Sequence, residues 1–353
     1  GRQEVVLDGH RLFGHTGWTQ GAQTNDAIRL NHSAGNHELN YVYIASSENG
    51  SHITSANANH DYHVIRAATE GVLGGKLTGM FVASMDDSAA TTGVSENEFY
   101  TIGARQAGKL GGLDYRVEYY HQFGDGGVDA STADLAEAYT TTPTLTAPGD
   151  IDRDANMFGI RIGKTFKNAS MSPTFTLWYD NLSGTDDTDV AGNDYGTFNT
   201  LQDTGHKFYG LIDNYTSDIG NGTQRYGLQD IALKTKFNVS AKNVLKIDFH
   251  QFLTQTDLED GDSDTIRANA TTSGAFQVAS HGAGKLSNDL GQEIDVTLVH
   301  KYDSNTKMVV GYSHYFTTLT HAWLNGSGGA DAVNRTNQND AQDWVYVMVD
   351  TKF

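Results

Sequence analysis

Segments in which apolar and polar side chains alternate recur along the whole chain. The clearest is GLDYRVEYYHQFG (112–124), where apolar side chains occupy every second position from Leu113. The same alternation occurs in MFGIRIGKTF (157–166), TFTLWYD (174–180), KNVLKIDFHQF (242–252), GQEIDVTLVHKY (291–302) and AQDWVYVMVDTKF (341–353). A helix would need apolar residues at i, i+3 and i+4, whereas a strand presents alternate residues to opposite faces. The pattern therefore predicts strands whose two faces meet different surroundings.

The connections between these segments alternate in length. Short turns such as NHSAGNH (31–37) and YDSNTK (302–307) separate long polar stretches. The long stretches cover about 47–59, 86–96, 124–153, 183–223, 257–288 and 320–340. Short periplasmic turns that alternate with long extracellular loops are typical of outer-membrane barrels, and a β-sandwich has no reason to keep that order. We therefore predict residues 1–353 to be a single domain, an all-β transmembrane antiparallel β-barrel with about 14 strands.

The composition is compatible with such a barrel and excludes several other classes. Mean hydropathy is -0.47, and no apolar run approaches the roughly 20 residues of a spanning helix. The 24 Lys and Arg against 43 Asp and Glu give a formal net charge of -19, which argues against a nucleic-acid partner. Because the chain has no cysteine, disulfides and thiolate metal sites are excluded.

One long connection differs from the others in being apolar. It contains HKFYGLIDNY (206–215), and its flanking strands must run in opposite directions, so the connection 183–223 leaves and returns on the same side of the membrane. A stretch this apolar is not expected to extend into water. We expect it to fold inward and narrow the pore, while an outward hairpin is the alternative. The expected constriction residues are His206, Phe208, Tyr209 and Asp213.

Both ends of the chain have the pattern of wall strands. GRQEVVL (1–7) is typical of the middle of a strand, and the last segment places Val345, Val347 and Val349 on one side. We expect the last strand to run to the periplasmic rim and to close against the first, because an unpaired edge is costly in lipid. The final Phe353 then lies in the aromatic girdle at the interface, and it resembles the C-terminal Phe or Trp of outer-membrane barrels.

The first thirty residues carry a recognisable motif. GRQE at Gly1–Glu4 is followed by Arg11-Leu12-x-Gly14, Trp18, and Asp26-Ala27-x-Arg29-Leu30. This motif resembles that of the alginate export family of outer-membrane barrels, and HKFYGLIDNY followed by GLQDIAL (227–233) resembles a later family element. The resemblance implies a channel in a barrel of about 16 to 18 strands, with further strands before the motif.

The polar side of each strand is expected to face the lumen, where a pore's selectivity is determined. Its basic members are Arg2, Arg29, Lys76, Arg105, Arg116, Arg161, Lys234, Lys236 and Lys246. Its acidic members are Glu4, Asp114, Glu118, Asp180, Asp230, Asp248, Glu293 and Asp295. Opposed rows of charge would select solutes by charge and dipole. The alternative for each residue is mutual pairing that stabilises a wet interior.

This mixed lining predicts a channel, without a cofactor, for passive diffusion of small hydrophilic solutes or oligosaccharides. Export of an anionic polysaccharide such as alginate is the first alternative, and it would need a continuous cationic track. The second alternative is a barrel-anchored binding protein that acts through its acidic loops. The expected partners are the solute, outer-membrane lipid and lipopolysaccharide. Both a monomer and a trimer are compatible with barrels of this class.

The acidic loops contain one candidate cation site. DLEDGDSDT (257–265) places Asp260, Asp262 and Asp264 at alternate positions, and carboxylate oxygens suit Ca²⁺. The segment lacks the spacing and closing glutamate of an EF-hand, so a solvated acidic loop is the alternative. The 14 histidines do not form a metal motif, and neither G-x-S-x-G nor a P-loop occurs. We therefore do not predict an enzyme.

Overall fold

The structure is a computed structural model that describes most of the strand regions. The described residues are 1–19, 21–48, 60–86, 98–126, 152–186, 189, 192, 194–215, 223, 226–257, 287–318, 320–321 and 341–352. Most of each expected long loop other than 183–223 lies outside this set, as do Phe353 and the candidate cation ligands Asp260, Asp262 and Asp264. Within the set, no helix combines the length and hydropathy needed to cross a bilayer.

The described strands form one sheet in chain order, which confirms the predicted all-β antiparallel fold. Antiparallel pairing runs without a break from β1 through β9, on to β11 and through β15. Strand β10 lies outside this order and pairs with β8 in parallel. The first strands are β1 Arg2–Gln3, β2 Thr24–Ala34, β3 His37–Glu48, β4 His60–Val72, β5 Gly75–Asp86, β6 Phe99–Leu110, β7 Leu113–Asp125 and β8 Asp152–Thr165. The others are β9 Thr174–Leu182, β10 Asp194–Tyr195, β11 Leu228–Asn238, β12 Asn243–Leu253, β13 Asp289–Lys301, β14 Thr306–Thr317 and β15 Gln342–Thr351.

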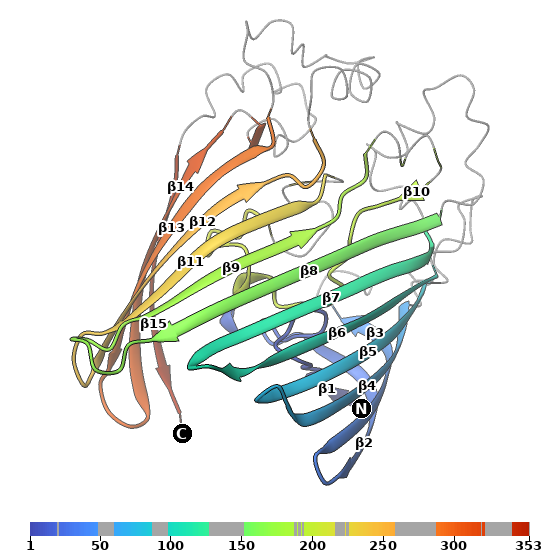
Figure 1. The fold of residues 1–353 in the computed structure, drawn as a ribbon, viewed down its shortest axis with the longest axis horizontal. Helices are drawn as coiled ribbons and strands as arrows, with labels where there is room; N and C mark the ends of the chain where they lie inside the picture. Colours follow the sequence, from blue (N-terminus) through green and yellow to red (C-terminus); the bar gives the residue numbers. More distant parts are fainter. Residues whose placement is uncertain are drawn as a thin grey trace, which may run out of the picture.

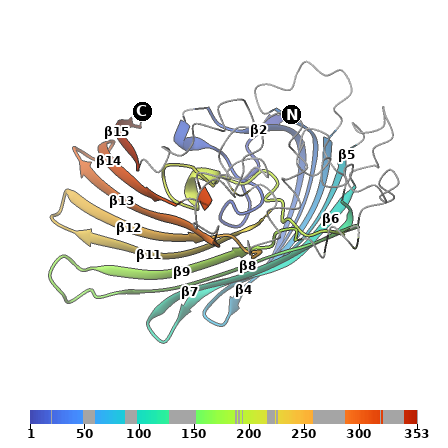
Figure 2. The ribbon, with the colours of Figure 1, turned by 90° about the horizontal axis from the view of Figure 1, so that it is seen from above.

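The sheet curls into a deep wall with one hollow side (Figures 1 and 2). Apolar side chains cover its outer face, as the alternation predicts: Leu177 and Val345 are 65% and 66% exposed. The inner face carries buried polar residues such as Glu118, Asp180 and Glu293. A wall that is apolar outside and charged inside fits lipid on one side and water on the other.

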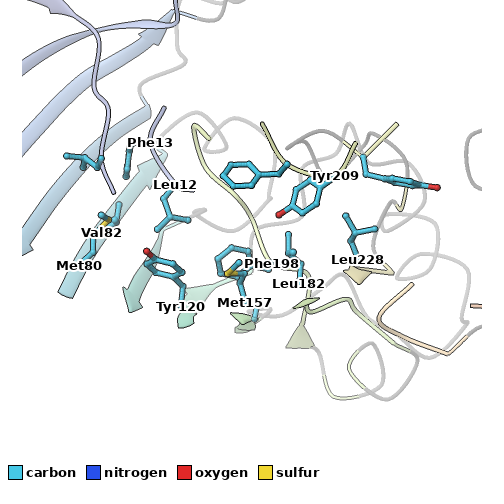
Figure 3. Packing of buried hydrophobic residues seen from close by; sticks show 14 of the residues in the cluster. Leu12, Phe13, Met80, Val82, Tyr120, Met157, Leu182, Phe198, Tyr209 and Leu228 are labelled. Carbon is cyan, nitrogen blue, oxygen red and sulfur yellow. The ribbon is translucent and has the colours of Figure 1, made fainter. Parts of the chain in front are cut away.

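Two segments fold into the hollow (Figure 2). The N-terminal segment, residues 4–19, and the described part of the inner segment, residues 183–215, contact each other through backbone hydrogen bonds. The Gly14 amide donates to the Gln202 carbonyl over 2.8 Å, and the Gln202 amide donates to Leu12 over 2.9 Å. Both segments pack on the inner wall: in Figure 3, Leu12 lies above Tyr120, and Tyr209 lies above Leu182 and Leu228. These buried residues form an apolar core inside the sheet.

The prediction of a wall strand over GRQEVVL is wrong beyond Gln3. Val5 and Leu7 are 1% and 3% exposed in the interior core. The chain reverses at Asp8–His10, three residues with positive φ, and the Leu7 amide donates to the Phe13 carbonyl. Here the alternate apolar residues bury one side of an inward loop. A wall strand has the same alternation in its sequence, so the two cannot be distinguished by pattern.

The expected pairing of the last strand with the first is absent among the described residues, where β1 and β15 end the path. The two edges are connected through the interior instead. Trp18, in the short helix η1 (Gly17–Thr19), lies edge-on to Tyr346 of β15 with ring centroids 4.8 Å apart. The same Trp18 stacks on His206 of the inner segment at 4.4 Å. One aromatic side chain thus joins both inward segments to the last strand.

Candidate pore interior

Arg11 of the N-terminal segment lies at the centre of the interior. It is 1% exposed, and its guanidinium bonds to Asp180 at 2.6 Å and to Glu118 at 3.1 Å. It also donates to the Tyr209 hydroxyl at 2.6 Å and lies 4.0 Å from the Phe208 ring centroid. A buried guanidinium is stable only where such partners replace water. Arg11 therefore joins the wall, the N-terminal segment and the inner segment.

The strand register brings the two carboxylates together. Glu118 of β7 and Asp180 of β9 both pair with Gly159 of β8. A Cβ atom at Gly159 would lie 2.8 Å from Asp180 Oδ1 and 3.0 Å from Glu118 Cγ. The missing side chain therefore lets both carboxylates reach one guanidinium.

Three further arginines, which with Arg11 we call the arginine group, surround the same carboxylates. Arg105 and Arg116 lie 3.7 and 3.5 Å from Glu118, and Arg161 lies 3.5 Å from Asp180. Arg161 and Arg116 also lie over the Trp178 ring, whose face attracts cations. Four arginines thus share two carboxylates in the part of the lumen that the inward segments cover.

Lys207 adds an exposed cation to this group. It ends the short helix η3, Gly205–Lys207, in the inner segment. Partial burial lowers the pKa of Lys207, and the nearby positive charges of Arg116, Arg105 and Arg11 lower that pKa further. Glu118 acts in the opposite direction but does not reverse the shift. Burial is the largest cause of the shift, and the contributions of the three arginines show that Lys207 lies near other cations.

A second wall region holds the inner segment through an acid. Glu293 of β13 is fully buried and accepts the amides of Leu211 and Ile212 at 2.6 and 2.9 Å. A Cβ atom at Gly210, where φ is +87°, would lie 2.5 Å from the Glu293 carboxylate. Only glycine allows this approach without strain.

The neighbouring polar and charged side chains on the same inner face bond to one another. His250 Nδ1 lies 2.9 Å from Asp230, and the Ser313 hydroxyl donates to Asp295 at 2.5 Å. Lys234 lies 3.5 Å from Asp248 and 4.5 Å from the Trp178 ring centroid. This region is therefore held by side-chain hydrogen bonds and by the ion pair of Lys234 with Asp248.

The N-terminal segment has another anchor at Asp8. Its carboxylate receives two hydrogen bonds from Arg66 of β4, at 2.6 and 2.7 Å. Arg66 also contacts Glu38 at 3.1 Å, and Glu38 in turn pairs with Lys76 at 3.0 Å. A bidentate pair fixes orientation as well as distance, so Asp8 and Arg11 together determine where the segment lies.

The structure separates the residues named from sequence into a central set and peripheral ones. Arg105, Arg116, Glu118, Arg161 and Asp180 converge around Arg11. Lys76, Asp114, Lys234, Lys246, Asp248, Glu293 and Asp295 lie elsewhere on the inner face, and Arg29 bonds to Asn31 in β2. Arg2 pairs with Asp26 at the sheet edge, and exposed Glu4 follows it. Arg2 and Glu4, which the sequence placed in the lumen, therefore lie at the edge of the sheet.

The expected constriction residues lie in the hollow. Phe208 and Tyr209 are buried against Arg11, while His206 bonds to Asp213 at 2.8 Å. The sequence reasoning did not assign Arg11 or Lys207 to the lumen, although Arg11 lies in the N-terminal motif. Within the ranges that the structure describes, no three His, Asp or Glu side chains are arranged to hold a metal ion.

A curved antiparallel wall with an apolar outer face, a charged inner face and segments folded inside defines an outer-membrane channel or export pore. The sequence profile of the alginate export family matches residues 1–318, and the chain belongs to that family. Its location is the outer membrane.

Two solved porin structures align with the chain. A NanC porin aligns over 84% of this chain and 96% of its own, with 7% identity and a TM-score of 0.33. OccK11 (OpdR) of Pseudomonas aeruginosa aligns over 90% of this chain and 71% of its own, with 11% identity and a TM-score of 0.46. A comparison with curated proteins gives no match.

Proposed function

We propose that this outer-membrane channel lets small hydrophilic solutes and oligosaccharides diffuse passively and that it prefers anionic ones. The observation that carries the proposal is the arginine group, in which four cations share the carboxylates of Glu118 and Asp180, beside exposed Lys207. A water-filled passage with low-dielectric walls concentrates ions of opposite charge. An anion that passes the inner segment would meet Lys207 before the buried arginines.

The test is single-channel conductance of refolded protein in a planar bilayer, with the reversal potential read under a salt gradient. We expect discrete current steps and a reversal potential that indicates anion preference. Lys207→Gln should weaken that preference, whereas Arg2→Gln, at the sheet edge, should leave it unchanged. Cation preference in the wild type, or equal effects of the two substitutions, would contradict the proposal.

Export of an anionic polysaccharide is the second candidate. Family membership and the arginine group favour it. The two candidates differ in the size of the solute that passes. A small uronic acid should permeate in both cases, but only an exporter should let a long polyuronate leave liposomes that contain the protein. Retention of the polymer together with release of the monomer would favour the diffusion channel.

A further inference from the structure

Three carboxyl groups on the inner wall are buried without a lysine or arginine partner among the described residues. Asp230 of β11 and both Glu293 and Asp295 of β13 are at most 2% exposed. In the part of the chain that the structure describes, their ion pairs are with His250 of β12, which lies 2.9 Å from Asp230 and 3.9 Å from Asp295. A charged His250 would offset one of three negative charges. Because an uncompensated buried carboxylate is costly, we do not expect all three acids to be ionised together.

The two acids of β13 contact each other. They are two residues apart and lie on the same face of the strand, and their carboxyl groups are within hydrogen-bond distance. One oxygen of each is already used: Glu293 Oε1 accepts the amides of Leu211 and Ile212, and Asp295 Oδ1 accepts the Ser313 hydroxyl. Glu293 Oε2 and Asp295 Oδ2 are buried and meet no hydrogen-bond donor among the described residues. Two carboxylates in contact repel each other, so this contact indicates a proton on one of them.

A third buried atom without a partner lies beside this pair. His250 Nδ1 is bonded to Asp230, whereas His250 Nε2 has no hydrogen-bond partner in the described ranges and lies 3.9 Å from Asp295 Oδ2. The register places His250 directly opposite Glu293. Within the same ranges these side chains are not arranged to hold a metal ion. A proton needs only two oxygens in contact, so it is the ligand that this arrangement suits.

We propose that Glu293 and Asp295 form a buried proton site, in which one shared proton keeps the inner segment docked; the expected effect on the current rests on the proposed channel function. With the proton in place, Glu293 can lie against Asp295 and still accept the amides of Leu211 and Ile212. When the proton passes to the solvent, two adjacent buried carboxylates remain. Their repulsion would move Glu293 away from these amides and release the inner segment.

The other groups that face the pair cannot replace the proton. Asp230 adds a further negative charge from β11, and His250 of β12 is already bonded to it. Tyr315 of β14, which pairs with Glu293 in the register, donates its hydroxyl to the Leu290 carbonyl. Tyr215 of the inner segment bonds to the Tyr315 hydroxyl. These neighbours therefore supply no permanent positive charge.

The direction of the pH dependence follows from where the proton is bound. Release of the inner segment would expose both carboxyl groups to water, where they ionise at about pH 4. The docked segment therefore holds a proton that the released segment gives up. By linkage, the ratio of released to docked protein should rise about tenfold for each pH unit once the docked pair begins to lose its proton.

Infrared spectroscopy of the detergent-solubilised protein tests the proton site without any current. We expect the carbonyl band of a protonated carboxyl group at neutral pH and its loss between about pH 7 and pH 10. Glu293→Gln and Asp295→Asn should each lack the band from the start, because the new amide donates to the remaining carboxylate. Glu70→Gln, which changes an exposed acid of β4, is the control and should keep it. A band that is unchanged in both amide variants would overturn the proposal.

Single-channel recording over the same pH range tests the effect on the inner segment. The wild-type current should become larger and noisier as the pH rises. In Glu293→Gln the amide can accept from Leu211 and Ile212 and donate to Asp295, so the current should stay steady. An alkaline transition that persists in Glu293→Gln would contradict the proposal, as would a transition that follows sodium concentration at constant pH.

Heat-dependent gel mobility verifies that each variant is folded. The two measurements separate failure of the proton site from failure of the channel. A protein with the expected band but without current would keep the proton site and refute the channel. A conducting protein without the band would do the reverse.

Discussion

The arginine group and the opposed lysines Lys236 and Lys246, which we call the mouth lysines, have the same sign of charge in the same interior, yet their surroundings are opposite. Arg11 is buried between the wall and the inner segment and meets two carboxylates. Lys236 and Lys246 are exposed and face each other. Buried paired charges hold the inward segments in place, whereas exposed opposed charges remain available to a solute. Burial therefore separates paired charges from exposed ones among residues that the sequence presents as one set.

Removing Arg11 should give the largest effect. Arg11→Met leaves Glu118 and Asp180 buried without their central cation, and breaking a buried pair in this way costs about 3–5 kcal/mol. We expect the N-terminal segment to detach, with faster chymotrypsin cleavage inside it, for example after Phe13, and a larger, noisier single-channel current. Arg2→Met, which removes an exposed pair with Asp26, is the matched control and should change neither. An unchanged current in Arg11→Met would mean that the inward segments do not limit conduction.

Gly159→Ala tests the same site without removing a charge. The new methyl would lie 2.8 Å from Asp180 Oδ1 and 3.0 Å from Glu118 Cγ, so the carboxylates must move apart and overpacking should cost about 1–3 kcal/mol. The expected result is a weaker form of the Arg11→Met behaviour in both assays. Gly79→Ala, where a Cβ meets nothing within 4 Å, is the control. If both alanine variants behave like the wild type, close approach of the carboxylates is not required.

Acidification should loosen the N-terminal segment by a smaller amount. Burial, followed by the charges of Lys207 and His15, lowers the pKa of His10 to about 4. The released segment binds a proton near the ordinary value of about 6.5, and the docked segment does so only near 4. Docking is therefore most stable above about pH 6.5 and weakens as the pH falls toward 4. We expect the single-channel current to become larger and noisier over this range, as in Arg11→Met.

His10→Gln should reduce that pH dependence. Burial also lowers the pKa of His321 to about 4, so a residual dependence in His10→Gln should disappear on adding His321→Gln. His32→Gln, at the exposed end of β2, is the control. A dependence that is the same in His10→Gln as in the wild type would assign the effect to other groups.

The wall of this protein is predictable from sequence because lipid and lumen impose a period of two. Val117 and Leu177 lie outside, and Glu118 and Asp180 lie inside, as the alternation predicts. The interior is not predictable in the same way. Arg11 is 107 residues from Glu118 and 169 from Asp180, and no local pattern encodes that meeting. Val5 and Leu7 are an example. An inward loop packed on the interior core and a strand of the wall both have apolar residues at alternate positions.

The smallest expected effect tests the mouth lysines through stability. Lys236→Glu would replace a like-charge pair with an opposite-charge pair across β11 and β12, and such cross-strand pairs are worth roughly 0.2–1 kcal/mol. The urea midpoint of unfolding should therefore rise slightly. Lys109→Glu, which places a glutamate opposite Asp114, should lower the midpoint by a similar amount. If Lys236→Glu leaves the midpoint unchanged, solvent already screens the repulsion, and the mouth lysines differ from Lys109 only in lacking an acid.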